Sequence, residues 1–180
     1  MELVDLLVDR RNLMGLESEV PEHVPQRLRV GVISQQGFCH WKIRPSGDIH
    51  WIEPFEARLP YQLPPSFRSL ITRYVFLPFR IGPITLLGNT GEERYGELCS
   101  LKFGDQDLAL GLFQHGYLPF AHPIPWNGDP VCFDMKRRDE SGEAPIVKVD
   151  HEGILCGGRI IVKAEFAPSF VQLISDFLAL

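Results

Sequence analysis

The chain begins with apolar residues spaced three or four positions apart between Glu2 and Leu16. This spacing puts them on one side of an α-helix, and Gly15 is a suitable place for that helix to end. A linker with two prolines follows at 20–27, after which apolar and polar positions alternate. Alternation predicts β-strands. We expect strands at 28–34, 38–44 and 49–52, with a turn at 45–48.

The middle of the chain returns to a helical pattern. Phe67, Leu70 and Ile71 fall on one helix face. Prolines at 64 and 65 suit a first helical turn, where no backbone donor is needed. We therefore predict a helix over 63–74. The apolar runs that follow predict strands at 77–80, 83–87 and 98–103, a loop at 88–93, and a helix at 108–114.

The stretch from Gly111 to Met135 contains the strongest turn signals. An apolar strand at 117–121 leads into a proline-rich bend that contains Trp126, and a second strand follows at 131–134. Between them, Asn127-Gly128-Asp129 predicts a tight turn, because asparagine and glycine tolerate positive φ angles at little cost. Further along we expect turns at 140–143 and 152–153, strands at 145–149 and 160–164, and an amphipathic closing helix from Pro168 onward.

Composition and charge narrow the functional classes. The 180 residues are 44% hydrophobic and 23% charged, which suits one globular domain. A net charge of −5 argues against a protein that binds nucleic acid by neutralising phosphates. No apolar run approaches the roughly 20 residues of a membrane span, and the acidic N-terminus does not resemble a signal peptide. We expect a cytoplasmic protein without a membrane partner.

The order of several short motifs resembles the SMI1/KNR4 (SUKH) superfamily. They are a Leu-Pro-x-x-aromatic helix, a Leu-Pro-Phe-Ala strand, a Gly-Asp turn, an apolar strand ending in Asp, and a Ser-Phe-x-x-Leu-Ile helix. The matching residues are Leu63, Pro64, Phe67, Leu118–Ala121, Gly128, Asp129, Cys132, Phe133, Asp134, Ser169, Phe170, Leu173 and Ile174. The resemblance covers about residues 55–180. It departs from the family at 73–76, where Arg-Tyr-Val-Phe replaces a common Asn-Gly pair.

The resemblance implies an α+β fold with helices packed on a curved, mainly antiparallel sheet. Residues 1–54 would then be a helix and strand-rich extension packed on an SMI1/KNR4-like domain at 55–180. Bacterial members of the family are chiefly immunity proteins that bind and neutralise toxins, many of them nucleases or deaminases. Fungal members are cell-wall and growth regulators that act as interaction scaffolds. Neither role is enzymatic.

Residue types that bind metals do occur near one another. His115, His122, Cys132 and Asp134 lie within 20 residues, but they lack the close ligand pairs of zinc sites. Packing and hydrogen bonding are therefore the better interpretation, and we expect no metal, no cofactor and no catalytic residues. A hydrolase or metal-binding enzyme that uses His122, Cys132 and Asp134 is the weakest alternative. No Gly-x-Ser-x-Gly motif supports a nucleophile.

The bend supplies the candidate partner-binding residues Trp126, Asn127 and Asp129. A loop tryptophan either packs over the core edge or is an exposed interface anchor, and the sequence leaves both open. Asp129 is also a typical turn residue that hydrogen-bonds its own backbone. Acidic positions in predicted loops and helix starts would attract a basic partner if they share one face. They are Glu92, Glu93, Asp105, Asp107, Asp139, Glu140 and Glu143.

These observations lead to one functional prediction. We expect a non-catalytic protein-binding module, namely a bacterial immunity protein that binds and neutralises a toxin domain. The protein partner could be a basic toxin or nuclease domain, without direct contact to nucleic acid. The alternative is a regulatory interaction scaffold of the same fold, and a toxin gene next to this one would favour immunity.

Overall fold

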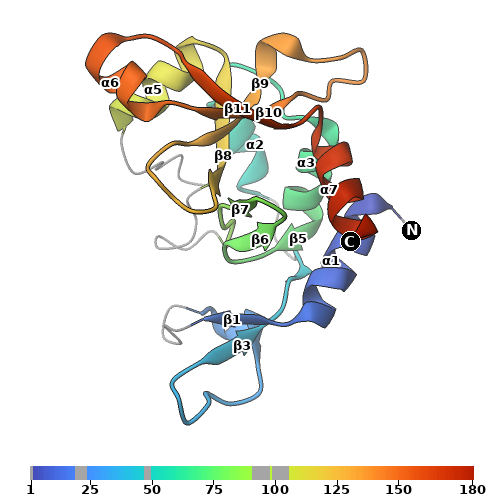
Figure 1. Ribbon diagram of the computed structural model, residues 1–180. Coiled ribbons are helices and arrows are strands. Elements are labelled where there is room, and N and C mark those ends of the chain that lie inside the picture. The colour runs from blue at the N-terminus through green and yellow to red at the C-terminus, as the bar shows by residue number, and fades with distance from the viewer. Residues whose placement is uncertain (1, 19–23, 47–49, 91–97, 99–105) are drawn as a thin grey trace.

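A computed structural model describes residues 2–18, 24–46, 50–90, 98 and 106–180 (Figure 1). Its centre is a six-stranded antiparallel sheet with the strand order β11-β10-β9-β8-β7-β6. The strands are β6 (Phe79–Ile81), β7 (Ile84–Leu86), β8 (Tyr117–Pro123), β9 (Val131–Asp134), β10 (Ile146–Val149) and β11 (Val162–Ala167). Consecutive strands are neighbours throughout, so the sheet is a meander.

Helices cover both faces of this sheet. On one face lie α1 (Leu3–Met14), α3 (Pro65–Arg73) and α7 (Phe170–Ala179), which contact one another. On the other face α5 (Gln106–Gln114) packs against α6 (His151–Gly157) and β8. Cys132 belongs to the small core beneath α5 and α6, whereas its neighbour Phe133 belongs to the main core. Because both faces are covered, every residue of β9 is buried.

Four phenylalanines from distant parts of the chain meet in the main core. Phe67 on α3 lies 5.2 Å from both Phe120 on β8 and Phe133 on β9, measured between ring centroids. Phe120 and Phe133 stack at 3.9 Å, and Phe170 on α7 meets Phe67 edge-on at 5.5 Å. All four side chains are fully buried. The short motifs in the sequence therefore supply one shared aromatic core, and the α+β prediction is confirmed.

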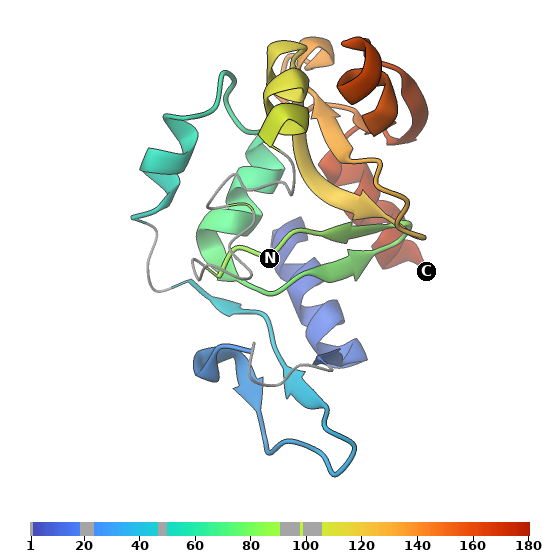
Figure 2. The ribbon, with the colours of Figure 1, turned by 90° about the vertical axis from the view of Figure 1, so that its left-hand side faces the viewer.

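The N-terminal part forms a second, smaller sheet. Its strands are β1 (Leu16–Ser18), β2 (Arg29–Val30) and β3 (Cys39–Trp41), with the order β1-β3-β2. A 3-10 helix, η2 (Gln26–Leu28), precedes β2, and β4 (Arg44–Pro45) pairs with β5 (Tyr74–Val75). Figures 1 and 2 place this small sheet at the opposite end of the molecule from α5 and α6.

The N-terminal part and the remainder share one core. Leu7 and Val8 of α1 and Trp41 of β3 belong to the same buried cluster as the phenylalanines. Helix α2 (Ile52–Glu56) runs across the expected boundary between residues 54 and 55, and the position of that boundary stays a prediction. None of the described helices is long and apolar enough to cross a membrane.

In two places the structure has a short helix where the sequence predicted another element, so those predictions are wrong. Ile52 was expected at the end of a strand, but it begins α2, in which Ile52 and Phe55 are buried. The expected turn at 152–153 lies inside α6, where Asp150 caps the first turn and Gly158 ends the helix in the left-handed conformation. Helices of five and seven residues have too few turns to show a helical period.

Two further expectations concern strand positions. The strand expected at 160–164 is observed at Val162–Ala167, so the prediction overlaps its first half. The strand expected at 98–103 falls almost entirely outside the described residues. Only Leu98 of that range is described, and it is buried in the main core.

Candidate functional site

The connection from β8 to β9, residues Ile124 to Pro130, carries an exposed tryptophan. We call this segment the Trp126 bend. The Trp126 side chain is 70% exposed, and its neighbour Ile124 is 38% exposed. The indole ring meets the His122 ring at a centroid distance of 5.6 Å and an angle of 62°, so one of its edges rests on the end of β8. Trp126 therefore projects from the surface, and its role as an interface anchor stays a prediction.

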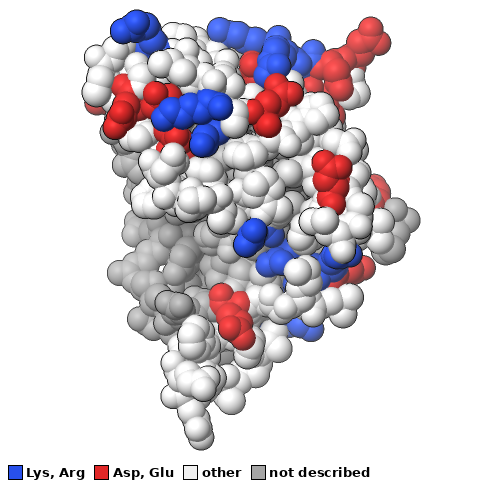
Figure 3. All heavy atoms as spheres, in the orientation of Figure 1, with Lys and Arg blue, Asp and Glu red and all other residues white. Residues whose placement is uncertain are grey.

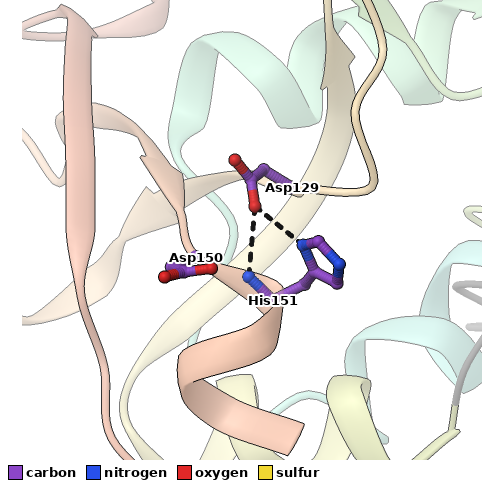
Figure 4. A group of neighbouring side chains, drawn as sticks. All are labelled: Asp129, Asp150 and His151. Atoms are coloured by element: carbon purple, nitrogen blue, oxygen red, sulfur yellow. Dashed lines mark hydrogen bonds and ion pairs between the residues drawn. The ribbon is translucent and has the colours of Figure 1, made fainter.

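Below the tryptophan, Asp129 is fully buried and holds the bend in place. Its Oδ1 accepts hydrogen bonds from the backbone nitrogen of His151 at 3.2 Å and from the Nδ1 of that residue at 2.8 Å. Lys163 Nζ lies 3.2 Å and 3.3 Å from the two carboxylate oxygens. Asn127 Nδ2 donates to Oδ2 at 2.9 Å. Figure 4 shows Asp129 facing the start of α6. One carboxylate thus ties the bend to both α6 and β11.

The burial of Asp129 changes the expected role of this residue. A side chain with no exposed surface cannot contact a partner in this conformation. The residue that forms the local turn is Asn127, whose Oδ1 accepts from the Asp129 backbone nitrogen at 3.3 Å. Asp129 is therefore a positioning residue. Trp126 and Asn127, which are both exposed, remain available as contact residues.

Charge compensation keeps Asp129 ionised. Burial alone would raise its pKa, but hydrogen bonds from His151, Lys163 and Asn127 outweigh that effect and lower the pKa to about 2. Lys163 also lies 2.9 Å from Asp150 Oδ1, and this contact is the main cause that raises the pKa of Lys163. The same hydrogen bond lowers the pKa of Asp150. The network thus holds two carboxylates around one ammonium group.

In the described part of the chain, one group of three residues has side chains of metal-binding types close together, and it belongs to this network. Ligand atoms of Asp129, Asp150 and His151 fall within 4.8 Å of one another. The Lys163 ammonium group bonds to both carboxylates at 2.9–3.2 Å, so a protein cation already occupies the position between them. The group is part of an ion-pair network around the buried Asp129 carboxylate, and the partly exposed Lys163 completes it.

The four metal-capable residues singled out from the sequence have separate partners. His115 Nδ1 lies 2.7 Å from the Gly111 carbonyl oxygen, and His122 packs against Trp126. Cys132 is fully buried in the small core, where desolvation raises its pKa well above the ordinary value. Asp134 pairs with Arg137 at 2.8 Å. The hypothesis of an enzyme built on His122, Cys132 and Asp134 thus has no converging site in the described structure.

Two of the acidic loop positions, Asp139 and Glu143, serve the fold, whereas Glu140 is exposed. Asp139 Oδ1 accepts from the backbone nitrogens of Ser141 and Glu143 and so closes the tip of the β9–β10 hairpin. Glu143 is buried and binds Ser66 at the start of α3. Glu92, Glu93 and Asp105 lie outside the described residues. Acidic and basic residues are equal in number among the described ones, so the net charge of −5 comes from the others.

Sequence reasoning missed His151 and Lys163 as parts of the site. They lie 22 and 34 residues from Asp129, and no motif joins them. The one available signal was Asp150 before a short apolar stretch, which is a typical start of a helix. Recognising α6 would have placed His151 at its first turn.

Comparison with known proteins supports the resemblance seen in the sequence. The model of the SMI1 / KNR4 family (SUKH-1) matches residues 48–176. This match contains the whole six-stranded sheet and the Trp126 bend. It leaves out α1 and the small N-terminal sheet. No curated protein and no solved structure matches the chain.

Proposed function

The chain belongs to the SMI1/KNR4 (SUKH-1) family, and on this premise we propose that it is an immunity protein, a non-catalytic module that binds and neutralises a toxin domain. The observation that carries the proposal is Trp126, an exposed tryptophan on a bend that the buried Asp129 carboxylate holds in place. The Trp126 bend is the proposed contact surface.

Trp126 has the properties of an interface anchor. Tryptophan is enriched among the few residues that supply most of the binding energy in protein interfaces. Exposing 70% of this side chain to water is unfavourable, and a partner that covers it removes that cost. Because Asp129 already holds the bend in one conformation, binding requires little additional ordering of the backbone.

The arrangement around His151 supports a non-catalytic role. An aspartate that orients a histidine resembles part of a hydrolytic triad. Here, however, the His151 ring packs against Gly128, where an added Cβ would lie 3.0 Å from the ring carbon Cε1. Within the described part of the chain, no hydroxyl or thiol group hydrogen-bonds to His151. The pair therefore has no nucleophile to activate and is best explained as support for the bend.

The net charge of −5 supports a basic partner such as a nuclease domain. Opposite charges accelerate encounter, so the association rate would fall as salt is added. The prediction of a basic partner uses the net charge of the full sequence, because the described residues carry equal numbers of acidic and basic side chains.

The test uses the toxin domain encoded beside this gene. Wild-type protein should bind that domain and abolish its toxicity when the two are co-expressed. Trp126→Ala should weaken binding about 30-fold or more, as expected for the loss of a hot-spot side chain. Leu13→Ala is the matched control, because Leu13 is 87% exposed but lies on α1, far along the chain from the bend.

Two results would contradict the proposal. One is a wild-type protein that neither binds nor neutralises the neighbouring toxin. The other is a Trp126→Ala variant that binds as tightly as wild type, which would exclude the bend as the contact surface. Both variants should melt within about 2 °C of wild type, because neither exposed side chain supports the core.

A further inference from the structure

Three arginines gather where α1 meets α7 and β6. Arg10 and Arg11 both lie over the ring of Phe177, with guanidinium carbons 5.6 Å and 5.9 Å from its centroid. Arg80 is exposed on β6, a strand that contacts α7, and its positive charge lowers the pKa of Arg11. Figure 3 shows basic side chains gathered in this part of the surface. We call Arg10, Arg11 and Arg80 the arginine cluster.

The arginine cluster has no carboxylate partner within the described part of the chain. Arg10 Nη1 donates to the Leu178 carbonyl oxygen at 3.2 Å, and Arg80 Nε donates to the Gly82 carbonyl oxygen at 2.8 Å. Arg11 Nη1 has the sulfur of Met14 as its acceptor, at 3.6 Å. A thioether is a weak acceptor. The guanidinium groups of these three side chains therefore donate to uncharged acceptors.

Three other arginines form ion pairs with carboxylates, whereas Arg27 and Arg29 donate to the backbone carbonyl oxygens of Thr90 and Val24. Arg68 binds Glu56 at 2.6 Å, and Arg137 binds Asp134 at 2.8 Å. Arg73, on the neighbouring helix α3, binds Asp5 at 2.6 Å and also Glu2. Carboxylates of α1 therefore neutralise Arg73 and leave Arg10 and Arg11 of the same helix without an acid. What sets the arginine cluster apart is the buried Nε of Arg11, which has no hydrogen-bond partner among the described residues.

Arg11 shows that the cluster is electrostatically unfavourable without a ligand. Its Nε is buried and has no hydrogen-bond partner. Burial lowers the pKa of Arg11, and the positive charge of Arg80 lowers it further. Among the described residues, no carboxylate acts in the opposite direction on Arg11. A folded protein keeps such an arrangement at a cost in stability, because like charges repel and an orphaned buried donor loses its hydration.

We propose that Arg10, Arg11 and Arg80 form a binding site for a multiply charged oxyanion. The guanidinium group is a planar fork of donors that matches the oxygens of carboxylate and phosphate groups. An oxyanion bound between Arg11 and Arg80 would accept from their free nitrogens and neutralise the two charges that repel. The guanidinium groups of Arg10 and Arg11 both contact the Phe177 ring. This site is separate from the Trp126 bend and does not depend on the immunity role.

Two sources could supply this chemistry, a carboxylate or a phosphate, and the experiment separates them. The full chain is melted in sodium chloride, in inorganic phosphate and in citrate, each at the same ionic strength and pH 7.5. Binding to the folded state raises the melting temperature. At ten times the dissociation constant, a rise of about 5 °C is expected for a chain of this size. The larger rise, in phosphate or in citrate, identifies the preferred group.

The decisive variant is Arg80→Gln. It removes the charge that repels Arg11, so its melting temperature in chloride should be equal to or higher than that of wild type. It should also lose most of the rise caused by phosphate and citrate. Arg138→Gln is the matched control, because Arg138 is an exposed arginine of the basic run 136–138. That control should respond to both anions as wild type does.

Clear results would overturn the proposal. They are the absence of any rise in wild type with either anion, and an equal rise in wild type and Arg80→Gln. A marked drop in the melting temperature of Arg80→Gln in chloride would show that Arg80 stabilises the fold, which also contradicts the inference. Arg11→Gln provides a second test of the anion response, and its response should be lost as well.

Discussion

The carboxylate of Asp129 accepts a 2.8 Å hydrogen bond from Nδ1 of His151, a residue 22 positions further along the chain. An ionised carboxylate can only accept, so Nδ1 must carry the proton. The same oxygen accepts from the backbone nitrogen of His151, which ties it to the start of α6 as well. This relationship connects the loop that presents Trp126 to the helix beside it.

Removing the charge of Asp129 should destabilise the protein strongly. In Asp129→Asn, one carboxylate oxygen becomes an NH2 donor that cannot accept from Asn127 or Lys163, and Lys163 loses one of its two carboxylates. Because Lys163 is partly exposed and keeps Asp150 as a partner, the loss should be about 1.5–3 kcal/mol, the range for hydrogen bonds to a charged group. Urea unfolding measures the loss. The control Asn127→Ala removes two hydrogen bonds at the surface and should cost only about 1 kcal/mol. Equal losses for the two variants would contradict the central role of Asp129.

Stability should fall in acid because of the same residue. The pKa of Asp129 is lowered from 3.8 to about 2 on folding, so the unfolded chain takes up the proton first as the pH falls. The contribution is fully present above about pH 4 and disappears as the pH approaches 2. Free energies of unfolding, measured from pH 5 to pH 2, should show a smaller dependence on pH in Asp129→Asn than in wild type. Parallel curves would exclude Asp129 as the source.

Glu143 should act as the cap of α3. The N-cap residue of α3 is Pro64, which provides no side-chain cap. Instead, Glu143 accepts from the backbone nitrogen and the hydroxyl of Ser66, both at 2.8 Å. Glu143→Ala should cost about 1–3 kcal/mol because it leaves donors at a helix start without an acceptor. Ser66→Ala removes only the hydroxyl bond and should cost less. Chemical unfolding that ranks the two in the reverse order would refute the assignment.

Gly111 should be required by the contact between α5 and α6. A Cβ at this position would lie 2.6 Å from Cγ2 of Ile154. Glycine to alanine in a helix ordinarily stabilises by about 1 kcal/mol, but here we expect a loss of about 1–3 kcal/mol from overpacking. In the double variant with Ile154→Ala, the new methyl group should become favourable. A double-mutant cycle with no coupling between the two sites would contradict this contact.

The cysteines should differ in reactivity. Cys156 is exposed on α6, whereas Cys39 and Cys132 are buried. Burial raises the pKa of Cys132, which keeps it as the unreactive thiol. In a Cys99→Ser background, a thiol reagent should modify one cysteine quickly in the native state and the other two only on unfolding. Peptide mapping should assign the fast site to Cys156, and fast modification of Cys132 would contradict the packing of the small core.

The sequence by itself determined the elements whose burial follows a long, regular pattern. Helices α1, α3 and α7 could be predicted because each presents its apolar residues at the period that one buried helix face requires. Strands β8 and β9 are buried along most of their length, and short apolar runs on either side of a strong turn signal predicted them. The family followed from the order of short motifs, and the structure supplies the reason. Phe67, Phe133 and Phe170 meet in one aromatic core, so the residues that identify the family also hold the fold together.

Only the tertiary structure shows how the side chains of the site are arranged. Asn127-Gly128-Asp129 predicts a turn, but it does not say which side chain points inward. The inward position of Asp129 depends on His151 and Lys163. The positive charge that lowers the pKa of Arg11 comes from Arg80 on β6. His151 and Lys163 are 22 and 34 residues from Asp129, and Arg80 is 69 residues from Arg11 along the chain. Local sequence patterns indicate which residues are buried and where the chain turns. The packing of the sheet and helices determines which charged residues become partners.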